Sequence, residues 1–238
     1  MTTRSPKTAG GGGGRRQAKV RVKTAKQRSA SSQRWLERQL NDPYVAAARR
    51  AGYRSRAAYK LAEIDAKHRI LKPGRRVVDL GAAPGGWAQV AAERVRAVGD
   101  GGQVVAIDIL DMEALPGVAF IQLDFMAEEA PRRLEGMLRD NRADVVLSDM
   151  AGQGTGHVKT DHVRIMALAE AAAEFAMEVL APGGAFVCKV LQGGTERELL
   201  DRLKRAFTTV RHVKPPASRS ESAELYLVAL GFRRHQGS

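Results

Sequence analysis

Two hydrophobic patterns alternate along the chain from about residue 70 onward. Short apolar runs rich in valine and isoleucine are typical of buried strands. They are separated by segments whose apolar residues recur every three or four positions, as in amphipathic helices. The predicted strands are 76–80, 103–108, 118–124, 143–149, 185–190, 209–213 and 225–230. The helices predicted among them are 86–95, 128–139, 161–180 and 196–207.

This alternation predicts an α/β fold with a mainly parallel, seven-stranded sheet covered by helices on both faces. Pro182, Gly183 and Gly184 are expected to end the third of these helices. The last two strands are joined by a short loop that contains Pro215 and Pro216 rather than by a helix. We therefore expect them to form an antiparallel pair at one edge of the sheet.

Three further helices are predicted before the first strand, over residues 35–40, 44–51 and 56–67. Asp42 and Pro43 suit the N-cap and the first turn of the second of them, and Ser55 suits the N-cap of the third. Residues 33–70 then form a helical segment in front of the sheet. With the rest of the chain to residue 234, this segment makes one domain.

A different composition marks the N-terminus. Residues 1–36 contain ten Lys or Arg and no acidic residue, whereas the other 202 residues contain 29 basic and 26 acidic ones. Most of the formal net charge of +13 therefore lies in this region. A run of glycines from Gly10 to Gly14 and few large apolar side chains predict a disordered basic tail over residues 1–32. Such a tail suits sequence-independent binding of phosphates, and a solubility tail is the alternative.

The remaining composition limits the class of protein. The single cysteine, Cys188, excludes an internal disulfide framework and fits a reducing compartment. No apolar run approaches the roughly 20 residues of a membrane span. The glycine run also disfavours reading the basic tail as a transit peptide. We expect a soluble, cytoplasmic, monomeric protein without a metal site.

The sequence VVDLGAAPGGW at residues 77–87 predicts a strand that ends in a ligand-binding turn. A dinucleotide fingerprint is excluded because Ala83 replaces its second glycine, and no Gly-Lys-Ser/Thr of a phosphate loop occurs in the chain. The pattern D-x-G-x-x-P-G-G-[FW] instead resembles the first motif of S-adenosylmethionine-dependent methyltransferases, particularly the ribose 2′-O-methyltransferases of the FtsJ/RrmJ type. This resemblance implies S-adenosylmethionine as the cofactor and a Rossmann-like fold.

Acidic residues end four of the predicted strands. These are Asp79, Asp108, Asp124 and Asp149. Ligands of open parallel sheets bind beyond the carboxyl ends of the strands, so four acids at that edge predict a site, although a lone Asp is more often a turn former. Asp108 follows Gly85 by 23 residues, near the offset at which an acid binds ribose hydroxyls. We assign Asp108 to the adenosine ribose and Asp124 to the adenine amino group.

The same turn supplies the rest of the predicted cofactor site. Gly81 and Gly85 allow the backbone to approach the ligand closely, and Trp87 is expected to wall the pocket.

Polar residues also interrupt two later strands. Lys189 stands inside the apolar run 185–191, where an unpaired lysine is very costly, and Glu224 opens the last strand. An edge-strand lysine that reaches solvent and an exposed strand-start acid are the structural alternatives.

Five segments, in the same order along the chain, resemble motifs of the FtsJ/RrmJ family over residues 35–232. They are SRAAYKL at 55–61, DLGAAPGGW at 79–87, SDMA at 148–151, KVLQG at 189–193 and AELY at 223–226. The resemblance is to the group that methylates a uridine ribose in bacterial large-subunit (23S) rRNA. Two features depart from it: residues 1–30 have no counterpart in compact members, and Gly152-Gln153 replaces the usual Pro-Asn.

The resemblance implies a catalytic set of Lys60, Asp149, Lys189 and Glu224. In-line methyl transfer needs an aligned, deprotonated ribose oxygen. A lysine accepts that proton only if its pKa falls, which burial and a neighbouring ammonium both favour. We assign Lys189 as the proton acceptor and Asp149 and Glu224 as the acids that orient it. Lys60 either positions the ribose or stabilises the negative charge that develops on its oxygen.

Basic residues in the helical segment 33–70 are expected to line an RNA groove with Lys60 at its floor. They are Arg49, Arg50, Arg54 and Arg56, with Arg211, Lys214 and Arg219 as an extension. Because only 5% of the residues are aromatic, recognition should depend on phosphates and RNA shape. A tRNA anticodon-loop ribose methyltransferase and a non-catalytic ribosome-assembly factor are the alternative functions.

Deletion of residues 1–30 tests the phosphate-binding tail. We expect RNA affinity to fall steeply with salt in the full-length protein and less steeply after the deletion, because fewer counterions are released. The measurement is the slope of log affinity against log salt for both proteins. Equal slopes would show that the tail does not contact phosphates.

Overall fold

A computed structural model describes residues 36–37, 39–99, 101–151, 158–193 and 197–233, with the side chains of residues 158 and 159 left out. The predicted tail, residues 1–32, lies outside these ranges, as do Gly152 and Gln153. Of the first predicted helix, residues 36, 37, 39 and 40 are described, and they are helical.

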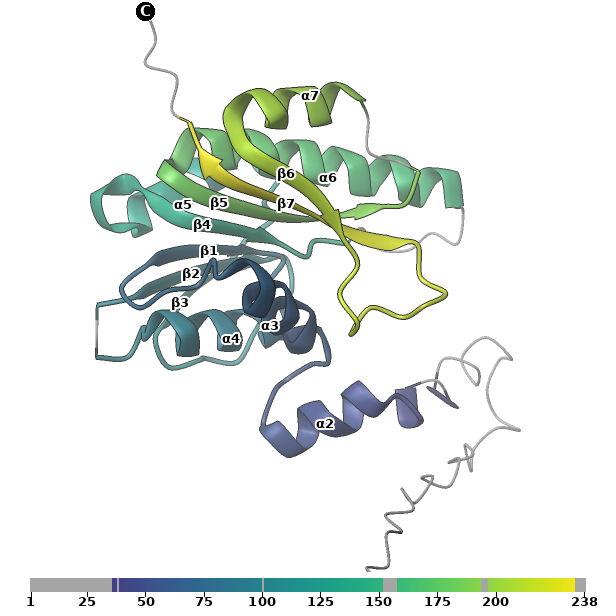
Figure 1. The fold of residues 1–238 in the computed structure, drawn as a ribbon. Helices are drawn as coiled ribbons and strands as arrows, with labels where there is room; N and C mark the ends of the chain where they lie inside the picture. The colour runs from purple at the N-terminus through teal and green to yellow at the C-terminus, as the bar shows by residue number, and fades with distance from the viewer. Residues whose placement is uncertain (1–35, 38, 100, 152–157, 194–196, 234–238) are drawn as a thin grey trace, which may run out of the picture.

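Seven strands form one sheet in the order β3-β2-β1-β4-β5-β7-β6 (Figure 1). The strands are β1 (Arg76–Leu80), β2 (Gln103–Asp108), β3 (Val118–Gln122), β4 (Ala143–Ser148), β5 (Leu180–Leu191), β6 (Phe207–Val213) and β7 (Glu224–Phe232). Strands β1 to β5 pair in parallel, and β7 pairs antiparallel with both β5 and β6. The mainly parallel sheet and the antiparallel pair at its edge are confirmed, with β7 as the inner member of that pair.

Helices cover both faces of the sheet (Figure 1). They are α2 (Pro43–Ala51), α3 (Ala57–His68), α4 (Gly86–Val95), α5 (Ala130–Met137), α6 (Val158–Val179) and α7 (Arg197–Ala206), with a short 3-10 turn η2 (Arg139–Asn141). Val78 and Leu80 of β1 pack with residues of α5, α6 and α7, whereas Val77 packs with α3 and α4. This alternation in β1 is the pleat of a strand buried on both faces.

The start of β5 differs from the sequence prediction. The strand begins at Leu180, so Pro182, Gly183 and Gly184 lie within it rather than in a turn after α6. The pairing of Ala143 with Leu180 and of Val145 with Ala185 shows a register shift between β4 and β5, which accommodates these residues as an irregularity. Proline and glycine therefore mark an irregularity at the start of β5, directly after the end of α6.

Of the two predicted helix N-caps, the one on α2 forms and the one on α3 does not. Asp42 accepts a hydrogen bond from the Tyr44 amide and caps α2, as predicted. Ser55 does not cap α3: the N-cap position is Arg56, and no side-chain hydrogen bond caps the helix. The buried Ser55 hydroxyl lies against Gly86, where it would clash with a β-carbon, and it has no hydrogen-bond partner in the described part of the chain. The chain just before α3 packs closely on the start of α4, and this packing places the Ser55 side chain against Gly86. Among the described helices, none is long and apolar enough to cross a membrane.

One acid lies inside the core of β1. Asp79 is fully buried, and neither carboxylate oxygen has a hydrogen-bond partner among the described residues. By the strand's alternation it points to the same side as Val77, toward α3 and α4. Burial, and then the charges of Asp149 and Asp108, raise its pKa to about 8 from an ordinary value of 3.8. Asp79 is therefore protonated in the folded protein at neutral pH.

The raised pKa of Asp79 predicts how stability changes with pH. Between about pH 4 and pH 8 the folded chain holds a proton on Asp79 that the unfolded chain has lost. This group therefore makes the free energy of unfolding fall as the pH rises through that range. We expect the fall to be smaller in Asp79→Asn, which is neutral at every pH, when urea unfolding is measured from pH 5 to pH 9. The matched control is Asp201→Asn on α7, and a wild-type-like pH profile in Asp79→Asn would contradict the buried, protonated state.

Candidate active site

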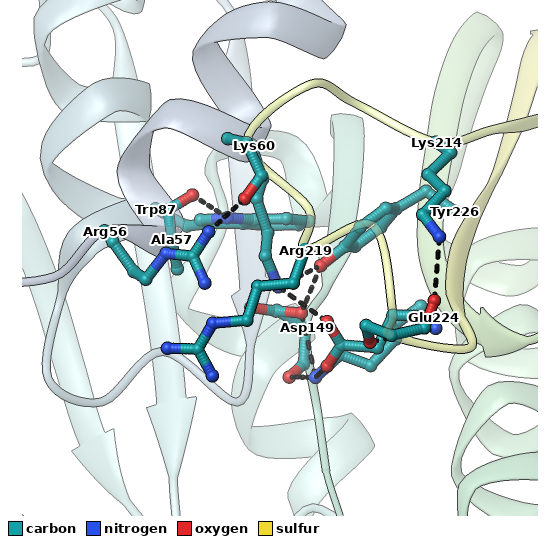
Figure 2. Close-up of polar contacts among 12 residues, drawn as sticks. Arg56, Ala57, Lys60, Trp87, Asp149, Lys214, Arg219, Glu224 and Tyr226 are labelled. Atoms are coloured by element: carbon teal, nitrogen blue, oxygen red, sulfur yellow. Dashed lines mark hydrogen bonds and ion pairs between the residues drawn. The ribbon is translucent and has the colours of Figure 1, made fainter. Parts of the chain in front are cut away.

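The structure brings together the four residues that the family resemblance implied, Lys60, Asp149, Lys189 and Glu224. Figure 2 shows Lys60, Asp149 and Glu224 of this group side by side. Lys189 Nζ lies 2.9 Å from Asp149 Oδ1 and donates to the Asp149 carbonyl at 2.8 Å. Lys60 Nζ lies 3.0 Å from Glu224 Oε2, and Lys189 Nζ lies 4.0 Å from Glu224 Oε1. The four side chains form one continuous ionic cluster.

Strand register explains why these residues meet. Ser148 pairs with Cys188, so Asp149 and Lys189 follow side by side at the ends of β4 and β5. Lys189 pairs in turn with Tyr226, and Leu191 pairs with Glu224. Val187 packs on the α3 side of the sheet, and Lys189, two residues later, points to the same side. Lys60 reaches the cluster from α3, so the site lies between that helix and the sheet edge.

Tyr226 completes the cluster, and the sequence analysis missed it. Its hydroxyl donates to Asp149 Oδ1 at 2.8 Å and accepts from Lys60 Nζ at 3.1 Å. The Lys60 ammonium also lies 5.6 Å from the centre of the Tyr226 ring. In the sequence, a tyrosine among leucines and valines is typical of an aromatic residue in the core. Only its position two residues after Glu224 indicates that both side chains lie on the same face of the strand.

Charge pairing decides the protonation of the cluster. Burial alone lowers the pKa of Lys189, but Asp149 and Glu224 outweigh burial, so the pKa lies above its ordinary value. Burial likewise acts to raise the pKa of Asp149, and Lys189 and Lys60 more than reverse it. Burial, followed by the Asp149 charge, raises the pKa of the Tyr226 phenol well above its ordinary value. The cluster thus holds a charged lysine, a carboxylate and a neutral phenol.

One cavity opens at the carboxyl ends of β1, β2 and β4, with a volume of about 650 Å³. Its wall combines carboxylates with apolar side chains, among them Asp108, Asp124, Asp149, Ile109 and Phe125. This size and mixture are typical of a small-molecule site. Apolar walls suit an adenine ring, and carboxylates suit ribose hydroxyls and positively charged groups, so the lining fits S-adenosylmethionine.

Gly81 forms the cradle at the base of this cavity. Its φ of +78° favours glycine, and a β-carbon there would lie 2.8 Å from Met150 Cγ and 2.9 Å from Met150 Cα. Asp108 accepts from the amides of Ala83 and Leu110, both at 2.8 Å, and so fixes the turn and the chain after β2. Gly81 and Asp108 both line this cavity.

Asp124 lies just after β3 and is exposed, with Oδ1 accepting from the Met126 amide at 2.9 Å. It forms a turn of the common kind. Asp124 is also one of the residues that line the cavity.

Three predicted cofactor residues lie outside the wall of this cavity. Asp79 is buried in β1, and Gly85 faces Leu115 and Met112. Trp87 is 3% exposed, and its indole donates to the Ala57 carbonyl at 2.8 Å. The centre of its ring lies 5.5 Å from that of Tyr226, with the two rings tilted at 39°. The expectation that the Trp87 ring walls the pocket is therefore wrong, because the close packing of α3 on α4 takes the indole into the core.

A second cavity, of about 410 Å³, opens on the other side of the ionic cluster. Its lining residues are Gln39, Arg56, Lys60, Arg219, Glu221, Ser222 and Glu224. Asp149 faces the first cavity, whereas Lys60 and Glu224 face the second. The cluster is therefore a partition with a small-molecule cavity on one side and a polar cavity on the other.

Only part of the predicted basic groove lies at this second cavity. Arg56 and Arg219 line it with Lys60, as predicted. Arg54 instead donates to the carbonyls of Pro84, Glu113 and Ala114, next to the cofactor turn. Lys214 donates to the carbonyls of Ser220 and Ser222 within its own loop. Arg49, Arg50 and Arg211 are exposed but are not among its lining residues.

Comparisons with known proteins agree with this geometry. The family model described as FtsJ-like methyltransferase matches residues 53–232. A ribosomal RNA large subunit methyltransferase E from Azorhizobium caulinodans is 63% identical over 218 residues, which cover 92% of this chain and 90% of the relative. Its counterpart from Parvibaculum lavamentivorans is 62% identical over 231 residues, covering 94% and 91%.

A solved structure is also similar. The crystal structure of a ribosomal RNA methyltransferase from Plasmodium falciparum has 33% sequence identity and a TM-score of 0.67, and the match covers 76% of this chain and 98% of that one. The family model spans most of the chain and includes all four residues of the ionic cluster. The chain belongs to the FtsJ-like methyltransferase family.

Proposed function

We propose that this protein is an S-adenosylmethionine-dependent methyltransferase that modifies a ribose 2′-hydroxyl of a uridine in the 23S rRNA of the large ribosomal subunit. The similar proteins from Azorhizobium and Parvibaculum carry the name ribosomal RNA large subunit methyltransferase E, which supports the substrate. The proposed domain is residues 33–234, with the basic tail as an additional RNA contact, and the proposed setting is the bacterial cytoplasm, with the protein as a monomer.

The observation that carries the proposal is the partition of two cavities by one ionic cluster. A methyl transferase must hold a donor and an acceptor on opposite sides of the transferred group, in line. Asp149 belongs to the wall of the larger, partly apolar cavity, and Lys60 and Glu224 belong to the wall of the polar one. The larger cavity fits the donor, and the polar cavity fits a ribose.

The donor would be held by the residues at the carboxyl ends of the strands. We propose Asp108 for the ribose hydroxyls, Asp124 for the adenine amino group, and Gly81 and Asp149 beside the methionine part. Trp87 would contribute its backbone amide, because the first N–H groups of α4 have no helical acceptor. The Gly85 amide donates to the Ala82 carbonyl, so Gly85 would serve by allowing the backbone to approach the ligand closely. Asp79 would support this turn from the core. Bound S-adenosylmethionine supplies a methyl group already activated on a positively charged sulfur.

Lys189 is the proposed proton acceptor for the ribose hydroxyl. Its ammonium is held by Asp149 and Glu224, which direct Nζ but also favour the charged form. Lys189 must therefore lose a proton before it can act. The pKa of a lysine falls when further positive charge approaches, so Lys60 on one side and a cationic donor beside Asp149 on the other both favour the neutral amine.

Lys60 and Tyr226 would act on the acceptor side. The Lys60 ammonium, fixed by Glu224 and by the Tyr226 hydroxyl, can stabilise negative charge that develops on the ribose oxygen. The Tyr226 hydroxyl bonds to both Lys60 and Asp149, and so it fixes these two side chains relative to each other. We assign Tyr226 a positioning role.

The substrate assignment is tested by incubating the protein with methyl-labelled S-adenosylmethionine and, separately, naked rRNA, large ribosomal subunits and tRNA. The modified nucleotide is then mapped. We expect label on one uridine ribose of large-subunit rRNA. Label on tRNA alone would place the protein in the anticodon-loop class, and label on no RNA, with bound RNA, would make it an assembly factor.

Replacement of Lys189 tests the proton acceptor. We expect Lys189→Ala and the longer Lys189→Met to bind S-adenosylmethionine with wild-type affinity but to lose methyl transfer by at least about 100-fold, the usual contribution of a general base. In the wild type, single-turnover rates should rise from pH 7 to pH 9, because the charge pairs keep Lys189 protonated at neutral pH. The control is Lys204→Ala, an exposed lysine of α7. Undiminished transfer by both Lys189 variants would refute the assignment.

A further inference from the structure

Three carboxylic acids lie on one face of the central strands. Asp79 in β1 pairs with Ala106 in β2 and with Leu147 in β4. Asp108 and Asp149 follow these two partners by two residues each, and residues two apart point to the same face of a sheet. The three carboxyl groups are therefore neighbours on one face, at the carboxyl edge of the sheet.

Two of these acids have hydrogen-bond donors, whereas Asp79 has none among the described residues. Asp108 accepts from two backbone amides, and Asp149 is paired with Lys189 and accepts from Tyr226. Asp79 is fully buried, and both of its carboxyl oxygens lack a partner in that part of the chain. A buried carboxylate without a donor is costly, and two neighbouring carboxylates increase the cost. Asp79 is therefore stable in its neutral, protonated form.

The helices that pack over this face bring no cation to Asp79. The buried residues of α3 include Lys60 and Asp65, and those of α4 include no titratable group. Lys60 pairs with Glu224, and Asp65 accepts from the amide of Leu71. From β5 and β7, Lys189 and Tyr226 face the same side and bond to Asp149. A positive charge that favours ionised Asp79 must therefore come from a ligand.

The cavity beside these acids is the proposed donor site. Gly81, Asp108 and Asp149 line it, and Gly81 follows Asp79 by two residues. S-adenosylmethionine carries a positive sulfur. When the methyl group leaves, the sulfur keeps the electron pair of the broken bond, so the product, S-adenosylhomocysteine, is a neutral thioether. A nearby positive charge favours a carboxylate, and a neutral sulfur does not. Asp79 therefore meets a different charge before and after the reaction.

We propose that Asp79 makes this cavity selective for the charged donor over its neutral product, by losing a proton to solvent when the donor binds and regaining one after the methyl group has left. This inference rests on the proposed function, because it takes S-adenosylmethionine to be the ligand. Asp79 is a specificity-determining residue and not a catalytic one, because it forms no bond to the cofactor. Its negative charge holds the donor, and its neutral form weakens the hold on the product.

The direction of the pH dependence follows from this proton exchange. Burial and the charges of Asp149 and Asp108 raise the pKa of Asp79 to about 8, and a bound cation lowers it. Below that pH, binding of the donor must expel the proton, so the affinity for the donor falls as the pH falls. Binding of the neutral product expels no proton. The selectivity for the donor therefore rises with pH until Asp79 is ionised without a ligand.

The first test counts the protons exchanged on binding. Full-length protein is titrated calorimetrically at pH 7 with S-adenosylmethionine and, separately, with S-adenosylhomocysteine, in phosphate and in Tris, whose ionisation enthalpies differ. We expect the wild type to release at least about half a proton more with the donor than with the product, because Asp79 is mostly protonated at this pH. Equal release with the two ligands would overturn the proposal, and this result needs no variant.

Asp79→Asn then assigns the proton to this residue. Asparagine is neutral at every pH and similar in size to aspartate, so the difference in proton release should disappear. The α-amino group of both ligands also titrates at about pH 8, but it does so with both proteins and cancels in the comparison. Asp201→Asn on α7 is the matched control and should behave as the wild type. A thermal melt checks the fold, and a wild-type difference in folded Asp79→Asn would refute the assignment.

The second test measures both affinities from pH 6 to pH 9. In the wild type, the Kd for S-adenosylhomocysteine divided by the Kd for S-adenosylmethionine should rise about tenfold between pH 6 and pH 8, the change that corresponds to one pKa unit. In Asp79→Asn the rise should be at most about twofold. An equal rise in both proteins would assign the selectivity to another group and overturn the role of Asp79.

The two proposals fail in different ways, because these measurements are of binding and need no RNA. Methyl transfer to rRNA with equal proton release for the two ligands would uphold the enzyme and overturn the role of Asp79. Proton-linked selectivity that Asp79→Asn removes, without label on any RNA, would uphold Asp79 and overturn the enzyme. Absence of S-adenosylmethionine binding would overturn both.

Discussion

The ion pair between Lys189 and Asp149 is the interaction on which the site depends. Both groups are largely removed from water, where an unpaired charge is costly, so each stabilises the burial of the other. Asp149 also accepts from Tyr226, which satisfies a further part of its hydrogen-bonding capacity. The pair can form because β4 and β5 are parallel and their register sets Ser148 beside Cys188, one residue before Asp149 and Lys189. The sheet topology therefore fixes the chemistry at its edge.

This ion pairing stabilises the protein without a bound ligand, but it makes Lys189 less able to accept a proton. A lysine between two carboxylates is well placed but protonated, and so it is a poor proton acceptor as it stands. Reactivity then depends on neutralising the acids from outside the cluster. A positively charged methyl donor next to Asp149 would do this only when it is bound. Proton transfer to Lys189 would then depend on whether the larger cavity holds the donor.

The fold could be predicted from hydrophobic pattern alone, whereas the site could be predicted only in part. Lys189 was visible because a lysine inside an apolar strand contradicts its surroundings, and Asp149 because acids gather at strand ends. Lys60 was found only through the family resemblance, since a lysine on an amphipathic helix has no distinguishing pattern. Tyr226 was missed for the opposite reason: a tyrosine suits a buried strand, and its hydroxyl becomes informative only when register places it beside Asp149.

Other misassignments have the same physical origin. Trp87 and Ser55 were interpreted from neighbours in sequence, but the approach of α3 to α4 decides both. The Trp87 indole bonds to Ala57, and Ser55 faces Gly86. Local rules describe what a residue can do when its helix is considered alone. They do not predict which residues will contact a helix from elsewhere in the chain.

Arg54 illustrates how that helix contact serves both sides of the site. Its guanidinium donates to Glu113 at 2.6 Å and Ala114 at 2.9 Å, in the chain that follows β2, and to Pro84 at 3.3 Å in the cofactor turn. Arg54 lies only a few residues before Lys60 on the acceptor side. The segment that leads into α3 is thus bonded directly to the loop that borders the donor cavity. Movement of either segment is therefore resisted by the other. The same arginine that charge pattern alone had assigned to RNA would thus help to fix the distance between the proposed donor and acceptor sites.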